Sequence, residues 1–476
     1  MVFDCLERRR GGNGRGMDAT TTTPESTSSL PRLSVGDTLR FVRDVGGPLV
    51  ARGLIIRRPR VVRALEVAGA DRRAVAFMAR MRDRYGDGPI QVAIPGRSVA
   101  LVVSPDHVHE ILDSTPHPFH PATTEKRSAL DHFQPEGVLA TRGPERDARR
   151  RLNEDVLEQD RPRHGLAERF DQVVDEEARW IAAQATGAGV LDWDTFERGW
   201  ERVVRRVVLG DAARDDMEVA DLVTRLRKDA NWAFAKPVRR GQRRRFHKVL
   251  GRYLERAEPG SLAAVLAEHS QDGHIEEPAQ QFPQWLFAFD PAGMATYRAL
   301  ALLAVHPRER QVALAEAEAD DDHPLLRAAV LESLRLWPTT PGILRELTTE
   351  HRWAAGTAPE GTTVMIFTPL FHRHPSLPDA DTYSPRRWLD HRSAVDWPLV
   401  PFSGGPAMCP GRNVVLTTTS AMLLALHRRL DLTLTEPGRL DPERLPSTLD
   451  PYTLEFTAAG RSSERVTASL ELEATP

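Results

Sequence analysis

The chain has 476 residues, of which 41% are hydrophobic and 28% are charged. This composition is ordinary for a globular protein with a large core and too polar for a bundle of membrane helices. The formal net charge of −3 indicates neither a nucleic acid nor a membrane as partner, and two cysteines exclude a disulfide scaffold and any four-cysteine metal site.

Residues 1–34 combine a basic cluster, a glycine-rich patch and a threonine run, without an apolar segment. A stretch of this kind has too little apolar surface to fold, so we expect a disordered tail that is neither a signal peptide nor a membrane anchor. Its first residue is open between Met1 and Met17, and without an anchor we expect a cytoplasmic protein. Residues 35–476 contain no long linker and no repeat, which indicates one large domain.

Beyond the tail, the pattern predicts mainly helices and a small β region. Residues 90–103 alternate and then become apolar across a Pro-Gly pair, which is typical of a β-hairpin. The apolar segment 282–305 contains Asp290, Pro291 and Arg298, so it predicts a buried helix of a globular protein. The other predicted elements are a helix over 325–336, a strand over 362–367 and a long helix over 412–430.

Cys409 stands in a loop rich in glycine and proline, directly before the last long helix, whereas Cys5 lies in the tail. Such a loop leaves backbone N–H groups free to point at the sulfur, and the helix N-terminus adds its positive dipole end. Both effects favour the thiolate. Three uses follow: a buried structural cysteine, a nucleophile with a histidine that spacing does not place, or an axial ligand to haem iron.

The cysteine loop resembles that of the cytochrome P-450 haem-thiolate enzymes, F-x-x-G-x-x-x-C-x-G, and matches it at Phe402, Gly405, Cys409 and Gly411. Three further segments resemble motifs of this family, in the family's order. They are residues 292–296 (A-G-x-D/E-T), residues 332–335 (E-x-x-R) and residues 385–388 (P-x-R-F/W). The resemblance implies a cytochrome P-450 fold, mainly α with a small β region, and haem b ligated by the Cys409 thiolate.

Glu332 and Arg335 are three residues apart and therefore share one helix face. The resemblance implies that Arg387 completes a Glu–Arg–Arg network that holds the cysteine loop in place.

The two haem propionates need cationic donors when they are partly buried. One donor of the family usually stands two residues before the cysteine, where this chain has Ala407. The resemblance implies that the cofactor is held by Arg146, Arg150, Arg345, Phe402 and Gly411.

Thr296 matches the family threonine that hydrogen-bonds the oxygen species, and the resemblance makes it the catalytic residue. The acidic residue that normally precedes this threonine is replaced by Ala295. Asp290 is six residues from Thr296 and so lies on a different helix face, but a kink at Pro291 would bring it or a water molecule closer. A water chain, protonation by the substrate or non-standard chemistry would equally account for the missing carboxylate.

The resemblance implies a monooxygenase that inserts one oxygen atom from O₂ into a small, mostly hydrophobic substrate, by hydroxylation or epoxidation in specialised metabolism. Electrons would arrive from ferredoxin or flavodoxin with its reductase, docked on a face carrying Arg149, Arg151 and Arg412. We expect the substrate cavity to be walled by Phe119, His120, Phe289, Ala292 and residues 340–343.

Two alternatives remain open. The chain is a peroxygenase, isomerase or dehydratase that uses no external electrons, or it is a haem-binding protein without turnover. Ala295 motivates the first alternative, and Ala295 together with Ala407 motivates the second.

Overall fold

The computed structural model describes residues 29–94, 96–271, 275–390 and 397–461. The described residues are mostly helical, as the sequence predicts. The helices of the N-terminal half are α1 (Val35–Phe41), α2 (Gly47–Ala51), α3 (Pro59–Val67), α4 (Ala70–Tyr85), α5 (Pro105–Asp113), α6 (Thr124–Leu130), α7 (Pro144–Val156), α8 (Ala167–Ala188), α9 (Trp193–Leu209) and α10 (Met217–Ala230).

The helices of the C-terminal half are α11 (Arg240–Arg256), α12 (Leu262–His269), α13 (Phe282–Val305), α14 (Pro307–Ala317), α15 (Pro324–Leu336), α16 (Thr368–His372) and α18 (Arg412–Arg429). Of these, α13, α15 and α18 are the helices that the sequence predicts. A π-helical turn, Val42–Gly46, joins α1 to α2. No helix in the described part of the chain is both long and apolar enough to cross a membrane.

The largest sheet has five strands in the order β1-β2-β8-β5-β3. The predicted hairpin is confirmed as its antiparallel pair β1–β2, and β2 runs parallel to β8. A three-stranded sheet has the order β4-β10-β9, and β6 pairs with β7. The strands are β1 (Ile90–Ile94), β2 (Arg97–Val102), β3 (Phe119–His120), β4 (Val190–Asp192), β5 (Gly342–Leu347), β6 (His351–Trp353), β7 (Gly356–Ala358), β8 (Thr363–Phe367), β9 (Leu430–Leu434) and β10 (Glu455–Gly460).

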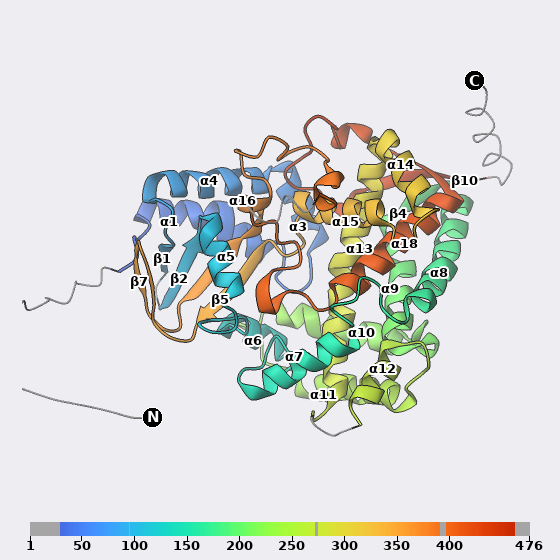
Figure 1. Cartoon of the computed structure of the whole chain (residues 1–476), viewed down its shortest axis with the longest axis horizontal. Coiled ribbons are helices and arrows are strands. Elements are labelled where there is room, and N and C mark those ends of the chain that lie inside the picture. Colours follow the sequence, from blue (N-terminus) through green and yellow to red (C-terminus); the bar gives the residue numbers. More distant parts are fainter. Residues whose placement is uncertain (1–28, 95, 272–274, 391–396, 462–476) are drawn as a thin grey trace, which may run out of the picture.

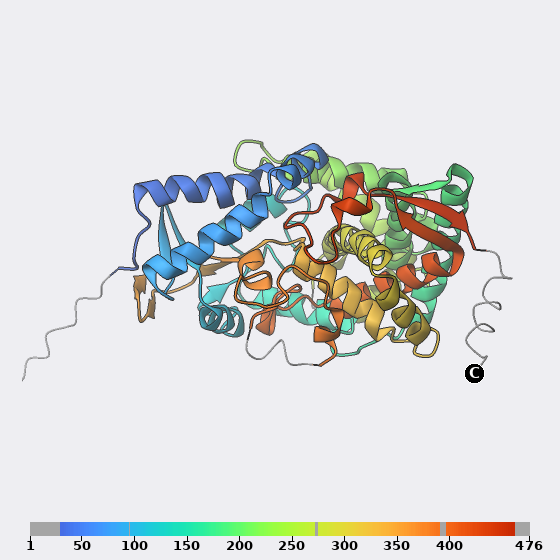
Figure 2. The same ribbon diagram turned by 90° about the horizontal axis from the view of Figure 1, so that it is seen from above.

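The apolar residues form two core clusters. The larger one lies among the helices, where α13 packs between α9, α15 and α18, and the smaller one lies between the five-stranded sheet and α4. Figures 1 and 2 show the sheet at the left end of the molecule and the helical bundle at the right end, with α13 running through the middle. Helix α13 is apolar on nearly all sides because it is surrounded by other elements.

The ordered chain begins earlier than we expected. Residues 29–34, which we assigned to a disordered tail, pack against the sheet. Leu30 and Leu33 are buried in the smaller core cluster, and the Leu33 amide donates to the Gln91 carbonyl oxygen at 2.9 Å. Two buried leucines supply the apolar contact that composition alone did not reveal. The rest of the expected tail, with Cys5 and both possible start residues, lies outside the described residues.

Candidate functional site

A cavity of about 1470 Å³ lies beside α13 and extends between the helical bundle and the sheet. Its wall is mostly apolar, which suits a ligand that is itself mostly hydrophobic. The wall takes residues from α2, α3, α6, α7, α9, α10, α13, β5 and the cysteine loop at residues 401–412.

The cysteine loop places Cys409 in the wall of this cavity, immediately before α18. The loop is closed by a hydrogen bond from the Cys409 amide to the Phe402 carbonyl oxygen at 3.0 Å. Gly405 has a φ of +60°, and a Cβ atom there would stand 2.1 Å from the Leu112 carbonyl oxygen. Only glycine therefore allows the loop to approach α5 this closely.

The Cys409 thiol is less acidic than the loop pattern predicted. Burial raises the pKa of Cys409, and this effect exceeds the opposing influence of the Gly411 amide, Arg150 and Arg412. The loop therefore acts in the direction that the sequence predicts, and burial opposes it. A metal ion bound to the sulfur would shift the balance toward the thiolate.

The cationic side chains that line the same cavity include Lys126, Arg146, Arg150 and Arg345. Burial, and next the charge of Arg146, lowers the pKa of Arg345 to about 10. Burial and the charge of Arg345 lower the pKa of Lys126 to about 7. The lowered pKa values of these two cations indicate a site that lacks negative charge, as expected where an anionic group binds.

Arg146 pairs with Asp147 and Arg150 pairs with Glu154, so a carboxylate ligand would be a further partner of these two cations. Arg146 has a buried Nε atom without a hydrogen-bond partner among the described residues. Arg345 donates to Thr115 Oγ1 and Ser403 Oγ, both at 3.1 Å, and Arg150 donates to the Met408 carbonyl oxygen at 2.8 Å. A cysteine sulfur next to buried guanidinium groups suits the iron and the propionates of haem, so the residues present fit this cofactor.

Lys126 is a residue that our sequence reasoning missed. It belongs to the short helix α6, and its Nζ donates to the carbonyl oxygens of Pro121 and Leu344 at 3.0 and 3.1 Å. Arg345 also donates to the Leu344 carbonyl oxygen, so the two cations stand close together. A single lysine in a short polar segment carries no signal of this kind in the sequence, because its neighbour Arg345 is 219 residues further along the chain.

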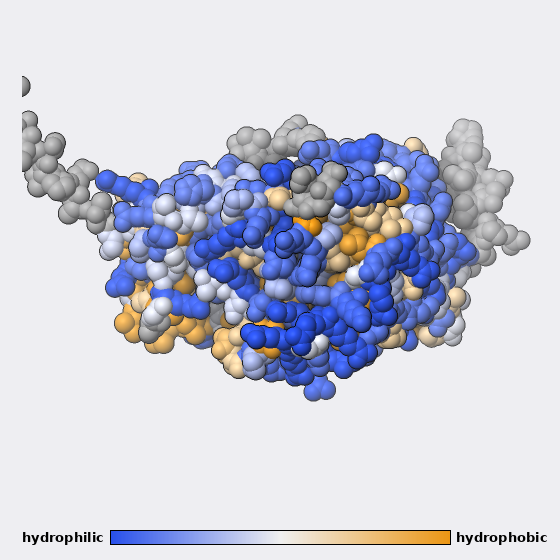
Figure 3. Space-filling model, turned by 90° about the horizontal axis from the view of Figure 1, so that it is seen from below, coloured by the Kyte–Doolittle hydropathy of each residue, from blue (hydrophilic) through white to orange (hydrophobic). Residues whose placement is uncertain are grey.

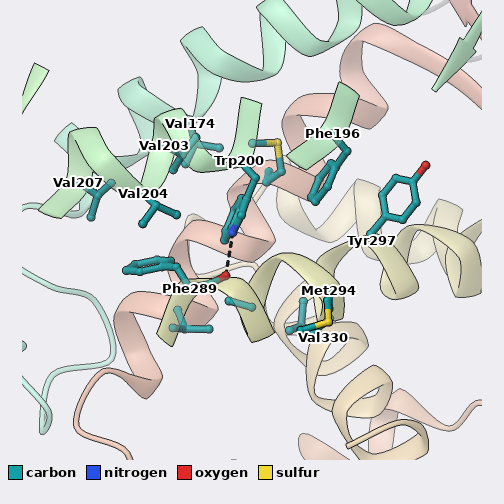
Figure 4. Packing of buried hydrophobic residues seen from close by; sticks show 14 of the residues in the cluster. Val174, Phe196, Trp200, Val203, Val204, Val207, Phe289, Met294, Tyr297 and Val330 are labelled. Atoms are coloured by element: carbon teal, nitrogen blue, oxygen red, sulfur yellow. Dashed lines mark hydrogen bonds between the residues drawn. The ribbon is translucent and has the colours of Figure 1, made fainter. Parts of the chain in front are cut away.

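Helix α13 carries the segment that resembles the oxygen-binding motif. Pro291 has no N–H and cannot donate to the carbonyl oxygen of Phe287. Close to this proline, Trp200 of α9 donates its indole N–H to the Phe289 carbonyl oxygen at 2.8 Å (Figure 4). A Cβ atom on Gly293 would stand 2.7 Å from the Trp200 ring, so this glycine lets the two helices meet.

Thr296 is fully buried in α13, and its hydroxyl donates to the Ala292 carbonyl oxygen at 2.9 Å. Ala292, Met294 and Ala295 line the cavity, whereas Thr296 is not among the residues of its wall. The kink that would bring Asp290 toward Thr296 does not do so, because the Asp290 carboxylate forms an ion pair with Arg227 of α10.

Glu332, Arg335 and Arg387 come together as the resemblance implies. Arg335 is fully buried and donates to both carboxylate oxygens of Glu332 at 2.6 and 2.9 Å, and Arg387 Nε lies 3.5 Å from Glu332 Oε2. Arg335 also donates to the His372 carbonyl oxygen, and the His372 ring accepts the Val400 amide at 3.0 Å. The network is thereby linked to the residue that precedes the cysteine loop.

Other expected wall residues are placed differently. Phe289, Ala292 and residues 340–343 line the cavity, but Phe119 and His120 do not. Phe119 is buried against the rings of His351 and Trp353, because β3 pairs with β5 and turns this side chain into the sheet core. Arg149, which we expected on an exposed docking face, is buried and paired with Glu136.

Comparison with known families gives one match. The family model of cytochrome P-450 matches residues 308–454, the segment that contains α15 and the cysteine loop. Cyclooctat-9-en-7-ol 5-monooxygenase of Streptomyces melanosporofaciens is 29% identical over 196 residues, which cover 36% of this chain and 42% of that enzyme. Cytochrome P-450 52-E3 of Starmerella bombicola is 29% identical over 154 residues, covering 28% and 30% of the two chains. The matched segments thus span less than half of these relatives.

Solved structures match over a larger part of the chain. Retinoic acid-bound CYP120A1 from a cyanobacterium has a TM-score of 0.65 at 18% identity, and the match covers 81% of this chain and 94% of that one. A six-coordinated cytochrome P-450 from Thermus thermophilus has a TM-score of 0.59 at 20% identity, with 81% and 98% covered. These likenesses confirm the fold that the sequence predicts.

Proposed function

The chain belongs to the cytochrome P-450 superfamily, and on this premise we propose that it is a monooxygenase acting on a small, mostly hydrophobic molecule. One atom of O₂ would enter the substrate by hydroxylation or epoxidation, and specialised metabolism is the setting we favour. The observation that carries the proposal is Cys409, which lines a large apolar cavity next to buried cations.

Several residues of this chain would together hold haem b. Cys409 would ligate the iron, while Arg146, Arg150 and Arg345 would bind the propionates, with Phe402 and Gly411 shaping the loop around the sulfur. Haem ligated by a thiolate supplies the activation of O₂. The rest of the site, above all the apolar wall beside α13, orients the substrate and excludes water.

Proton delivery is the step in which this chain departs from its family. Thr296 is not in the cavity wall, so to take part its hydroxyl would have to leave the Ala292 carbonyl oxygen, turn toward the cavity and bind a water molecule there, and this is the role that we assign to it. Ala295 offers no carboxylate and Asp290 is held by Arg227, so the water would receive its proton from solvent along the cavity.

Electrons would come from a ferredoxin or flavodoxin with its reductase. Arg151 is exposed on α7 and Arg412 is partly exposed at the start of α18, and both elements border the cysteine loop. A small acidic redox protein would be attracted to this basic face. We further propose that the protein works in the cytoplasm, where such partners occur.

The carbon monoxide difference spectrum of the reduced, purified protein tests the central assignment. A strongly red-shifted Soret band that is lost in Cys409→Ser supports the haem thiolate. A band typical of histidine-ligated haem, or no haem at all, would overturn it. Arg412→Gln serves as a loop variant that keeps the sulfur.

A second function, a haem-thiolate peroxygenase or isomerase without external electrons, is favoured by one observation, the absence of a carboxylate at Ala295. Turnover separates the two functions. Product with NADPH and redox proteins, and none with peroxide or with the enzyme alone, selects the monooxygenase. The reverse pattern selects the alternative.

A further inference from the structure

A second, smaller pocket is lined by residues of α3, α4, α13 and the loop at residues 448–452. Its wall contains three arginines, Arg52, Arg57 and Arg298, together with the carboxylate of Asp71. We call it the arginine pocket. Hydrophilic residues cover most of the face of the molecule that Figure 3 shows, and arginines on such a surface are solvated. The arginine pocket differs because its cations are withdrawn from solvent.

The positive charge of the arginine pocket is only partly neutralised. Arg52 donates to the Asp71 carboxylate at 2.6 Å, and the same carboxylate accepts the Thr448 hydroxyl at 2.8 Å. Among the described residues, neither Arg57 nor Arg298 forms an ion pair with a carboxylate. The hydrogen bonds of both go to carbonyl oxygens of the backbone. Two guanidinium groups of the pocket are therefore left without a counter-charge.

Arg298 of α13 also has an unused hydrogen-bond donor. Its side chain is 7% exposed, and its Nε atom is buried without a hydrogen-bond partner among the described residues. Burial lowers the pKa of Arg298 to about 10. The buried Asp450 acts on Arg298 by its charge alone, because its oxygens accept the Tyr452 amide and the Thr453 hydroxyl. A buried cation without a counter-charge is costly, so this arrangement points to an anion as the missing partner.

The arginine pocket offers a neutral donor besides its cations. The Tyr452 hydroxyl donates to the sulfur of Met294 at 3.3 Å, and a thioether is a weak acceptor. Burial raises the pKa of Tyr452 although Arg57 and Arg298 act in the opposite direction, so the hydroxyl keeps its proton. A carboxylate would be a stronger acceptor for this hydroxyl. The pocket measures about 30 Å³, which is room for about two water molecules or for the two oxygens of one carboxylate.

The arginine pocket adjoins the large cavity that Cys409 lines. The residues that line both spaces are Arg57, Met294, Thr339, Pro341 and Tyr452. The wall of the large cavity is mostly apolar, whereas the arginine pocket concentrates positive charge. A molecule with an apolar body and one carboxylate therefore matches the two spaces together.

We propose that the arginine pocket binds the carboxylate of the substrate, whose apolar body lies in the large cavity. The substrate is then a hydrophobic carboxylic acid, bound as its anion by Arg57 and Arg298. This inference rests on the proposed function, because it names the chemical class of that enzyme's substrate. The arginines that we assign to the haem propionates, Arg146, Arg150 and Arg345, do not line the arginine pocket, so the two anion sites are separate.

Calorimetric titration of the full-length, haem-loaded protein with decanoate and with 1-decanol tests the proposal. The two probes have the same number of carbons and differ in the charged end. We expect decanoate to bind at least about tenfold more tightly, because hydrogen bonds to a charged group are the stronger ones. Arg57→Gln should weaken decanoate binding by about fivefold or more and change 1-decanol binding by less than about twofold. Arg57→Lys keeps the positive charge and should keep the preference for decanoate.

Arg60→Gln is the matched control, because Arg60 of α3 is exposed and lines the large cavity but not the arginine pocket. It should leave the affinities for both probes unchanged. An unchanged Soret spectrum shows that each variant is folded and loaded. Equal affinities for the two probes, no binding of decanoate, or a preference that Arg57→Gln leaves intact would overturn the proposal. Formate that binds as tightly as decanoate would also overturn it and would identify a free small anion as the ligand.

The carbon monoxide difference spectrum of the same samples separates this inference from the haem assignment. A preference for decanoate that depends on Arg57, in a protein without the red-shifted band, would support the carboxylate site and refute the haem thiolate. The red-shifted band together with equal affinities for the two probes would refute the carboxylate site alone.

Discussion

Trp200 and Phe289 connect two helices at the point where α13 contains a proline. The indole N–H of Trp200 donates to the Phe289 carbonyl oxygen at 2.8 Å, and both side chains are buried (Figure 4). The bond comes from outside the helix, two residues before Pro291. It therefore fixes α13 against α9 next to Ala292 and Ala295, the residues that line the cavity.

Trp200→Phe keeps a buried ring but removes the N–H that reaches Phe289. We expect the free energy of unfolding to fall by about 1–3 kcal/mol, since a buried carbonyl loses a partner. Urea unfolding of the haem-loaded protein measures this. Trp232→Phe is the control, because Trp232 is 43% exposed and its ring contact with Arg58 is one that a phenylalanine ring can also make. Equal effects of the two substitutions would contradict the prediction.

Arg150 holds the residue before the cysteine, since its Nη1 donates to the Met408 carbonyl oxygen at 2.8 Å. Arg150→Gln removes this bond and one of the cations that we assign to a propionate. Haem release to an excess of apomyoglobin should accelerate by roughly tenfold or more. Arg151→Gln, which alters the exposed neighbour on α7, should release haem at the rate of the unaltered protein.

Glu332 neutralises two arginines, of which Arg335 is fully buried. Glu332→Gln leaves that guanidinium without a counter-charge, so we expect a loss of about 3–5 kcal/mol in the free energy of unfolding and little haem-loaded protein. An exposed ion pair provides the contrast. Glu318→Gln breaks the contact between Glu318 and Arg428, two side chains that are about half exposed. It should lower the free energy of unfolding by less than about 1 kcal/mol. Urea unfolding measures both variants, and similar losses in the free energy of unfolding would contradict the prediction.

Glu197 lines the cavity on α9, and its pKa is raised to about 7 by burial and then by the charges of Glu201 and Asp290. In the unfolded chain a glutamate ionises near 4.5. Between these two values the folded protein holds a proton that the unfolded chain has released, so stability falls as pH rises across this window and stays lower above it.

Glu197→Gln removes this dependence. Near pH 8 the variant should be more stable than the unaltered protein by on the order of 1–3 kcal/mol, and near pH 5 the difference should be small. Urea unfolding at the two pH values checks both statements. Glu168→Gln, at an exposed position of α8, should show no such pH-dependent difference.

Thr296→Ala tests the proton-delivery proposal. The hydroxyl bonds a carbonyl oxygen of its own helix, so its removal should leave the fold intact. Because we assign proton delivery to this hydroxyl, its removal should slow product formation by roughly 10²-fold. NADPH oxidation, peroxide release and product should be followed together, using a substrate that gives turnover in a screen. Thr418→Ala, a buried threonine of α18 with similar backbone bonds, is the control. Unchanged coupling of electrons to product would show that Thr296 is not the relay.

The sequence by itself determined the class of fold and the elements that carry the site. Local spacing was enough for this, because a helix face, a hairpin and a tight loop before a helix depend on residues within a few positions of one another. The buried helix that became α13, the pair Glu332 and Arg335 on one face, and the glycine-rich approach to Cys409 could all be read in this way.

Only the tertiary structure decided which distant residues meet. Lys126 stands beside Arg345, Asp290 is held by Arg227, and Arg149 is buried against Glu136 because separate helices and strands pack together there. The acidity of Cys409 and of Glu197 also depends on burial, which follows from the packed elements and not from neighbours in the chain.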